Sequence, residues 1–311
     1  MHKGDKMQEL FQNEAESNKK RLFQDKASSD KNAIFQDKIE IIDDFDLKKI
    51  ENSGEVFRFN EIGNGIFCTI AFGRILYIRK KQDNSNPLLY EISCSKKEFE
   101  EVWYNYFDLS TNYEKIRGMI PKEDDFLYKA AKYSKGVRIL SQDPWEMIVS
   151  FVISQRKNIP AIKKAVETLC ECAGTLIDDH KRIYAFPTPE QMYKMSDEDW
   201  NKCALGYRTK YLKSIVEQFY HKEITIKSLQ NLEDEQLYNR LLELYGVGPK
   251  VASCIMLFGF HRLNSFPKDV WILRILEEKY NNKFDLNTYA PYNGVIQQFM
   301  FYGSIELGRK V

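Results

Sequence analysis

The sequence predicts an α+β protein, in which a small N-terminal antiparallel sheet domain is followed by a larger all-helical body. Short aromatic and β-branched runs, separated by turn residues, fill the stretch from about 52 to 94. Helix-capping residues and helical periodicity dominate after Ser95, and a glycine-rich hairpin joins two helices at 244–250. The 311 residues suffice for about two domains, which we place at 41–135 and 136–311.

Composition narrows the class of protein further. Hydrophobic residues make up 43% and charged residues 29%, which excludes collagen-like, disulfide-stapled or wholly disordered chains. No apolar stretch approaches the roughly 20 residues that cross a bilayer, and the start is too polar for a secretory signal. The six cysteines are scattered, so we expect free thiols in a reducing compartment. A net charge of +1 does not by itself indicate a nucleic-acid partner.

Residues 1–40 are polar and charged and show neither helical nor strand periodicity. Such a segment buries too little surface to offset its ordering entropy, so we expect a disordered polar arm, with a marginal helix as the alternative. Antiparallel strands are expected next, because the intervening turns are too short for helical crossovers. The expected strands are 56–59, 66–70, 75–78 and 88–92, with turns at 63–65, at Gly73 and at 83–87.

Capping residues mark the helix starts. Asp143-Pro144 places a side-chain acceptor before a proline at the first helical position, and 145–153 is apolar enough for a central buried helix. Thr188 and Gln191 have the spacing of a capping box. Further helices are expected at 159–172, 208–220, 234–243, 249–260, 270–280 and 289–305.

The hairpin at 244–250 is the most informative stretch. Gly246 and Gly248 allow a tight turn, and Pro249 opens the second helix without losing a needed hydrogen bond. The free amides at the start of that helix form an anion site, which can grip a DNA phosphate without reading any base. A plain hairpin of two packed helices is the alternative.

Lys250 lies in the first turn of the second helix, and no acidic residue follows it until Asp269. This combination resembles the helix-hairpin-helix DNA glycosylase superfamily, and within it the 8-oxoguanine DNA glycosylase/AP lyases. The resemblance covers roughly residues 50–308. Its other motifs are Ser-Gly-Glu-Val-Phe-Arg at 53–58, Gln-Asp-Pro-Trp-Glu at 142–146, Ser-Gln-Arg-Lys-Asn-Ile at 154–159, Leu-Gly-Tyr-Arg at 205–208, and 292–294 through Phe301.

The resemblance implies that Lys250 attacks C1′ of the damaged nucleotide, displaces the base and forms a Schiff base, after which β-elimination nicks the strand. Such an amine must be neutral, and a helix N-terminus and desolvation both disfavour the ammonium form. Asp269 would stabilise the cationic sugar that develops. From the residues alone, the alternatives are a surface lysine and the N-cap of a helix beginning at Val270.

An enzyme that acts at C1′ must flip the nucleotide into a pocket. The resemblance implies that Cys254 and Phe301 sandwich the flipped base and that Gln297 hydrogen-bonds its Watson–Crick edge. Gly54 would supply a carbonyl that accepts from N7–H of the oxidised base and repels the N7 lone pair of guanine. Taken singly, the cysteine and the phenylalanine are also typical core residues, the glutamine a solvated helix residue and the glycine a turn residue.

Local charge supports a DNA-binding surface. The stretches 154–166 and 202–216 each carry four basic residues and no acidic one, although a solvated helix face is the alternative. The resemblance implies that Tyr207 wedges into the duplex and that Arg208 reads the opposite cytosine. The expected DNA-contact residues are Arg156, Asn158, Tyr207, Arg208, Gly246, Gly248 and Lys268.

The chain departs from the family pattern at three positions. Arg156 stands where asparagine is common, and Ala161 stands where the animal enzymes carry a second cytosine-reading arginine. Trp271 replaces the histidine that often follows Asp-Val. We therefore expect weaker discrimination among opposite bases than in those enzymes.

The sequence thus predicts a base-excision repair enzyme that excises 8-oxoguanine and cleaves the abasic strand. The alternatives are a glycosylase for alkylated bases, which typically lacks the lysine, and a non-catalytic helix-hairpin-helix module. We expect damaged double-stranded DNA as partner, no metal, no cofactor, no membrane and a monomer. An iron–sulfur cluster needs four closely arranged cysteines. No cysteine follows Cys254 in the chain, so we expect no such cluster. Lys-, Asn- and Ile-rich usage indicates an AT-rich bacterial genome, so we expect a cytoplasmic, nucleoid-associated protein.

Overall fold

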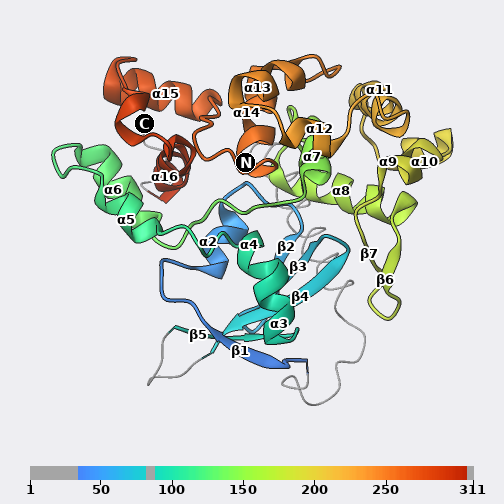
Figure 1. Ribbon diagram of the computed structural model, residues 1–311, viewed down its shortest axis with the longest axis horizontal. Coiled ribbons are helices and arrows are strands. Elements are labelled where there is room, and N and C mark those ends of the chain that lie inside the picture. Colours follow the sequence, from blue (N-terminus) through green and yellow to red (C-terminus); the bar gives the residue numbers. More distant parts are fainter. Residues whose placement is uncertain (1–33, 82–87, 307–311) are drawn as a thin grey trace, which may run out of the picture.

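The computed structural model describes residues 34–81 and 88–306, and the expected α+β class is confirmed. A five-stranded sheet occupies the lower part of the molecule in Figure 1, and helices spread above it. Most of the expected polar arm (1–33) and the expected turn at 83–87 lie outside the described residues. The domain boundaries at 41–135 and 136–311 stay a prediction.

The sheet is antiparallel throughout, with the strand order β1-β5-β4-β3-β2. Its strands are β1 (Asp37–Glu40), β2 (Phe59–Gly63), β3 (Ile66–Ala71), β4 (Arg74–Lys80) and β5 (Leu89–Ile92). The expected turns at 63–65 and at Gly73 connect β2 to β3 and β3 to β4, and their glycines have the positive φ that tight turns need.

Two expectations about strands were wrong. β1 lies inside the stretch 1–40 that we expected to be disordered, because pairing with the edge of β5 and burial of Ile39 order it. Residues 56–58 are buried, but β2 begins only at Phe59, and Arg58 contributes just its carbonyl, which accepts from the amide of Ile70 on β3.

Residues 53–58 instead form a connector between two cores. Phe57 packs in the core of the helical body, whereas Val56 and Phe59 pack in the core of the sheet domain. The Arg58 guanidinium pairs with Glu167 at 2.8 Å, which ties the connector to the helical body. The connector therefore holds its glycine, Gly54, against the helices.

Helices make up most of the remaining chain. In the first half they are α2 (Leu47–Asn52), α3 (Lys96–Glu98), a π-helical turn (Phe99–Trp103), α4 (Tyr104–Tyr106), α5 (Tyr113–Gly118), α6 (Asp125–Tyr133) and α7 (Pro144–Ser154). They continue as α8 (Ile159–Ala173), α9 (Pro189–Tyr193), α10 (Asp197–Lys202), α11 (Arg208–Tyr220), α12 (Ile226–Gln230) and α13 (Asp234–Leu242). The last are α14 (Pro249–Phe258), α15 (Val270–Tyr280), a 3₁₀ turn (Leu286–Tyr289) and α16 (Asn293–Glu306).

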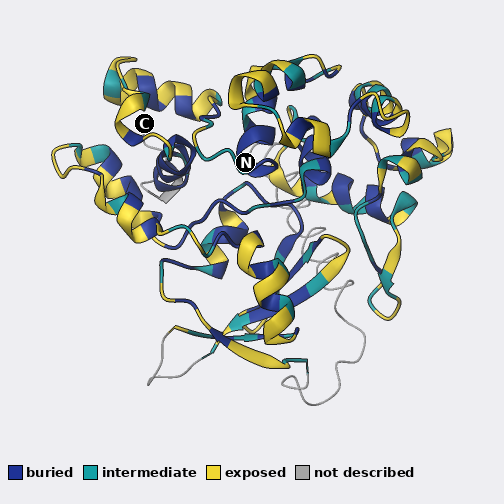
Figure 2. Ribbon diagram, viewed as in Figure 1, coloured by how far each residue is buried: buried dark blue, intermediate teal, exposed yellow. Residues whose placement is uncertain are grey.

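The capping signals were good predictors of these helices. Asp143 accepts hydrogen bonds from the amides of Trp145 and Glu146 at the start of α7, and Thr188 forms a reciprocal capping box with Gln191. The expected helices 208–220 and 270–280 match α11 and α15. Figure 2 shows α7, α14 and α16 as buried along most of their length, so they form the centre of the helical body.

The expectation of an all-helical body needs one correction. The strands β6 (Leu176–Asp178) and β7 (Ile183–Tyr184) form a short hairpin after α8.

Close packing holds α16 in place near both of its ends. A Cβ at Gly294 would lie 2.3 Å from Leu257 Cδ1 of α14, and one at Gly303 would lie 2.5 Å from Ala130 Cα of α6. Only glycine fits these two contacts, so they fix the position of α16.

Candidate active site

The hairpin between α13 and α14 has the geometry of an anion site. Gly246 has a φ of +86°, and the Tyr211 ring lies directly against it, because a Cβ there would meet ring atoms at 2.4 Å. Gln155 Nε2 donates to the Gly246 carbonyl at 3.0 Å, which braces the turn from α7. Gly248 is the N-cap of α14, and no side chain among the described residues caps that helix. Its first amides therefore remain available to a bound anion.

Lys250 and Cys254 lie one turn apart on α14, and the charge of Asp269, at the start of α15, acts on Cys254. The Lys250 amine is 5.6 Å from the centroid of the buried Phe151 ring. Burial raises the pKa of the Cys254 thiol, the charge and hydrogen bond of Lys250 oppose that rise, and the Asp269 carboxylate adds to it. Lys250 as a whole is exposed, Asp269 is half-buried, and Cys254 is buried. The amine thus hydrogen-bonds a buried thiol, and a carboxylate acts electrostatically on the same thiol.

Asp269 has the structural role that we gave as the alternative. Its Oδ1 accepts the amide of Ile272 at 2.8 Å, so it is the N-cap of α15. The cap fixes the carboxylate at a helix N-terminus, where negative charge is stabilised. The same geometry keeps it beside Cys254, so capping and a role in chemistry are compatible.

The connector and α16 meet on one side of this group. Gly54 has a φ of +81°, and a Cβ there would lie 3.4 Å from Phe301 Cε1 and 3.6 Å from Ile159 Cδ1. Gln297, one turn before Phe301 on α16, is buried, and its Oε1 accepts no hydrogen bond within the described residues. A buried amide oxygen without a donor is costly, which indicates that a ligand or water supplies the missing donor.

Apart from the hairpin glycines and Arg208, the expected DNA-contact residues lie on three loops. Tyr207 is 45% exposed at the N-cap of α11. Arg156 is exposed, with a φ of +55°, in the loop between α7 and α8. Asn158 caps α8 by accepting the amide of Ala161 at 2.9 Å. Lys268 is exposed next to Asp269.

Arg208 is buried, unlike the exposed residues of these loops. Its guanidinium is buried and donates to the backbone carbonyls of Gln155 and Leu205. Contact with an opposite base would require the side chain to leave these acceptors. In the structure Arg208 instead links the start of α11 to the end of α7.

Sequence reasoning missed the residues that brace the hairpin. Tyr211 packs on Gly246 and meets the Tyr245 ring edge-on, with ring centroids 4.8 Å apart. Lys210 Nζ lies 5.5 Å from the Tyr211 centroid and 5.7 Å from the Tyr245 centroid. Gln155 and Tyr211 are distant from the glycines in the chain, and no motif spacing connects them.

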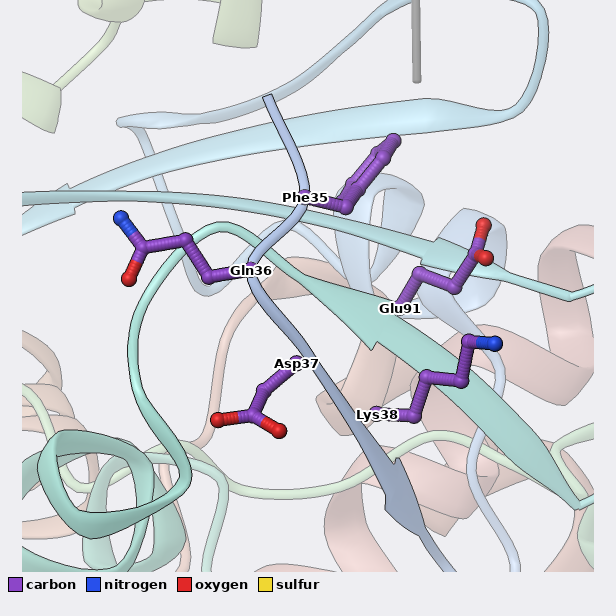
Figure 3. A pocket seen from close by; sticks show the side chains of 5 residues that line it. All are labelled: Phe35, Gln36, Asp37, Lys38 and Glu91. Carbon is purple, nitrogen blue, oxygen red and sulfur yellow. The ribbon is translucent and has the colours of Figure 1, made fainter. Parts of the chain in front are cut away.

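A separate hollow lies along β1, remote from α14 and α16. It has a volume of about 260 Å³ and is lined by Phe35, Gln36, Asp37, Lys38 and Glu91 (Figure 3). Figure 3 shows that these side chains do not point toward a common centre, so we do not place the site there.

The described residues offer neither a metal cluster nor a membrane-spanning helix. Within 34–81 and 88–306, no cluster of three or more His, Cys, Asp or Glu residues is arranged to hold a metal ion. Across the same residues, no helix combines the length and the apolar character that a bilayer span demands.

Two family profiles match the chain in succession. One is described as "8-oxoguanine DNA glycosylase, N-terminal domain" and matches residues 38–148. The other is described as "HhH-GPD superfamily base excision DNA repair protein" and matches residues 149–289. The two profiles meet between Ile148 and Val149, inside α7.

Individual proteins match over most of the chain. The structure of MBOgg1 in complex with a low affinity DNA ligand has a TM-score of 0.80 and 33% identity, covering 87% of this chain and 96% of that one. A Clostridium acetobutylicum 8-oxoguanine glycosylase/lyase, in complex with double-stranded DNA containing cytosine opposite to 8-oxoG, has a TM-score of 0.77 and 32% identity, covering 88% and 99%. The Arabidopsis thaliana N-glycosylase/DNA lyase OGG1 is 27% identical over 72% of this chain, and the match spans 63% of that relative's length.

Proposed function

Because the chain belongs to the 8-oxoguanine DNA glycosylase family of the HhH-GPD superfamily, we propose that it excises 8-oxoguanine from duplex DNA and then nicks the abasic strand. One observation carries the proposal. The Lys250 amine hydrogen-bonds the buried Cys254 thiol one turn along α14, and the Asp269 carboxylate at the start of α15 acts electrostatically on the same thiol. An amine nucleophile and a fixed negative charge are what cleavage at a deoxyribose C1′ requires.

In the proposed reaction, the neutral Lys250 amine forms a bond to C1′ while the C1′–N9 bond breaks and its electron pair leaves with the base. Positive charge develops on the sugar, and Asp269 stabilises it. The C1′–O4′ bond then breaks as the nitrogen lone pair completes the C1′=N bond of a Schiff base, and the two protons that the nitrogen gives up pass to the departing base and to O4′. Loss of a proton from C2′ then expels the 3′ phosphate, and hydrolysis of the Schiff base returns the lysine.

The walls of the proposed base pocket come from α14, α16 and the connector. Cys254 and Phe301 would contact the two faces of the flipped base, and Gln297 would bond its Watson–Crick edge. The unpartnered Oε1 of Gln297 supports this assignment, because an amino group on the base would supply its missing donor. The Gly54 carbonyl would accept from N7–H.

The DNA would lie across the exposed loops. The amides of the Gly246–Gly248 hairpin would bind a phosphate, and Tyr207 would enter the duplex beside the lesion. Arg156, Asn158 and Lys268 would contact the strands nearby. Arg208 joins this set only if it releases its carbonyl acceptors. In this proposal the protein acts as a monomer on chromosomal DNA.

Borohydride trapping on a duplex that contains 8-oxoguanine tests the proposal. The wild-type chain should form a covalent adduct, because borohydride reduces the Schiff base. Lys250→Gln should form none and should still bind the duplex. Lys227→Gln is the matched control, since Lys227 is an exposed lysine on α12, and it should trap as well as wild type. An adduct with Lys250→Gln would show that another amine does the chemistry, and the proposal would be wrong.

A further inference from the structure

Gly54 is held between two anchored carbonyl groups. Gln298 Nε2 on α16 donates to the Ser53 carbonyl at 2.8 Å. Gln142 Nε2, just before α7, donates to the Glu55 carbonyl at 3.1 Å. The two glutamines are 3% and 5% exposed, so these are buried bonds between uncharged groups. A buried amide that lost its acceptor would stay unsatisfied, so both bonds should persist in the folded protein.

Gly54 itself differs from its neighbours. It is the one residue from 53 to 59 that is not buried. No hydrogen bond to its carbonyl is present among the described residues, whereas the carbonyls on either side each have a donor. With both flanking peptides fixed, the Gly54 peptide between them has little freedom to rotate. The connector thus leaves one unpaired carbonyl at the edge of the proposed pocket.

We propose that Gln298 and Gln142 are positioning residues that orient the Gly54 peptide, so that it distinguishes 8-oxoguanine from guanine. This inference rests on the proposed function and goes beyond it, because neither glutamine would touch the base. The two bases differ at N7, where one carries a hydrogen and the other a lone pair. A carbonyl reads that difference only if it is held at hydrogen-bonding distance and angle.

The position of Gln298 on α16 fixes the distance between the Gly54 peptide and Gln297. Gln297 and Gln298 are consecutive, so one helix carries both the group proposed to bind the Watson–Crick edge and the anchor of the connector. That helix is fixed by the close contacts of Gly294 with Leu257 and of Gly303 with Ala130. The distance between the two recognition points is therefore set by a rigid element rather than by a loop.

The test separates recognition of the base from the chemistry at the sugar. In the full-length protein, Gln298→Met keeps the length of the side chain and removes its donor. We expect single-turnover excision of 8-oxoguanine to fall about tenfold, the loss that follows when one base contact is misplaced. Cleavage and borohydride trapping of a preformed abasic site should stay at wild-type levels, because no base has to be read there.

Two further variants complete the design. The readout is the ratio of the 8-oxoguanine excision rate to the abasic-site cleavage rate, which Gln298→Met should lower. Gln142→Met acts from a different element and should lower this ratio too. Gln218→Met is the matched control, because it removes a glutamine that donates to the Ser214 carbonyl on α11, and it should leave the ratio unchanged. If one positioning variant fails to fold, the other still decides the question.

Three outcomes would overturn the inference. The first is an unchanged ratio in a folded Gln298→Met or Gln142→Met protein. The second is a parallel loss of excision and abasic-site cleavage, which would mean general damage to the site. The third is a wild-type chain that cleaves abasic sites but never excises 8-oxoguanine, and this last result alone would also remove the proposed function.

Discussion

Substitution by alanine should have very different effects on stability at the two glycines of the hairpin. Gly246 has a φ of +86°, and an added Cβ would lie 2.4 Å from two atoms of the Tyr211 ring. Gly248 has a φ of −99° and a ψ of 177°, and an added Cβ would meet nothing within 4 Å. We therefore expect Gly246→Ala to be strongly destabilising and Gly248→Ala to be tolerated.

The structure sets the size of the difference. A left-handed backbone costs an alanine about 1–2 kcal/mol. Displacing the Tyr211 ring, which packs on Tyr245, should cost about 1–3 kcal/mol more through overpacking. Gly246→Ala should thus lower the free energy of unfolding by about 2–5 kcal/mol. Gly248→Ala should change it by no more than about 0.5 kcal/mol, because lost capping and reduced unfolded-state entropy roughly cancel.

Urea unfolding of both variants measures these free energies. A double-mutant cycle with Tyr211→Ala separates the cost of the clash with the ring from the cost of the backbone strain. Removing the ring relieves the clash but leaves the backbone strain, so Gly246→Ala and Tyr211→Ala should couple by about 1–3 kcal/mol. Affinity for an undamaged duplex should fall for Gly246→Ala at every sequence tested, because the hairpin would grip phosphate rather than bases.

Equal costs for the two glycine variants would refute the reasoning, since it attributes the difference to φ and to Tyr211 alone. Additive effects of Gly246→Ala and Tyr211→Ala would refute the steric part. Preserved DNA affinity in a destabilised Gly246→Ala protein would instead show that the hairpin does not contact the backbone of DNA.

Two other outcomes are expected. With Ala161 in place of a second cytosine-reading arginine and Arg208 engaged by carbonyls, excision from duplexes that pair 8-oxoguanine with each of the four bases should differ little; a strong preference for cytosine would contradict this. Burial raises the pKa of Glu146 from 4.5 to about 8, with Arg58 opposing and Asp143 and Glu167 adding to the rise. Between pH 4.5 and about 8, Glu146 therefore stays protonated in the native chain but loses its proton in the unfolded chain. The free energy of unfolding should fall as the pH rises through this range. Thermal unfolding across it should show a flatter profile for Glu146→Gln, and identical profiles would contradict the shift.

The local signals in the sequence predicted well where a short stretch decides its own structure. Proline at the first helical position and an acceptor before it fixed the start of α7, and the Thr188 box fixed the start of α9. The same holds for the hairpin, whose glycines and proline specify a turn and a helix start within five residues. Such features depend on bonds between near neighbours, so no tertiary information is needed to predict them.

The predictions that were wrong depended on distant partners. β1 has too few apolar residues to be recognised and is ordered by pairing with β5. Residues 56–58 have strand composition but lie between two cores, and the Arg58 side chain pairs with the distant Glu167 of the helical body. The DNA contact of Arg208 stays a prediction, and its side chain also has a distant partner, the Gln155 carbonyl, that the sequence did not indicate.

The order of residues along the chain was enough to predict the α+β architecture and the hairpin, and the family resemblance singled out Lys250 and Asp269 as a pair. Only folding decided that this lysine hydrogen-bonds a buried thiol, and that Gly54 faces Phe301, where an added Cβ would lie 3.4 Å from the ring. The physical reason is range. Caps, turns and periodicity act over a few residues, whereas the site is assembled by side-chain packing between elements that the sequence separates by up to about 250 positions, as in the bond from Gln298 to Ser53.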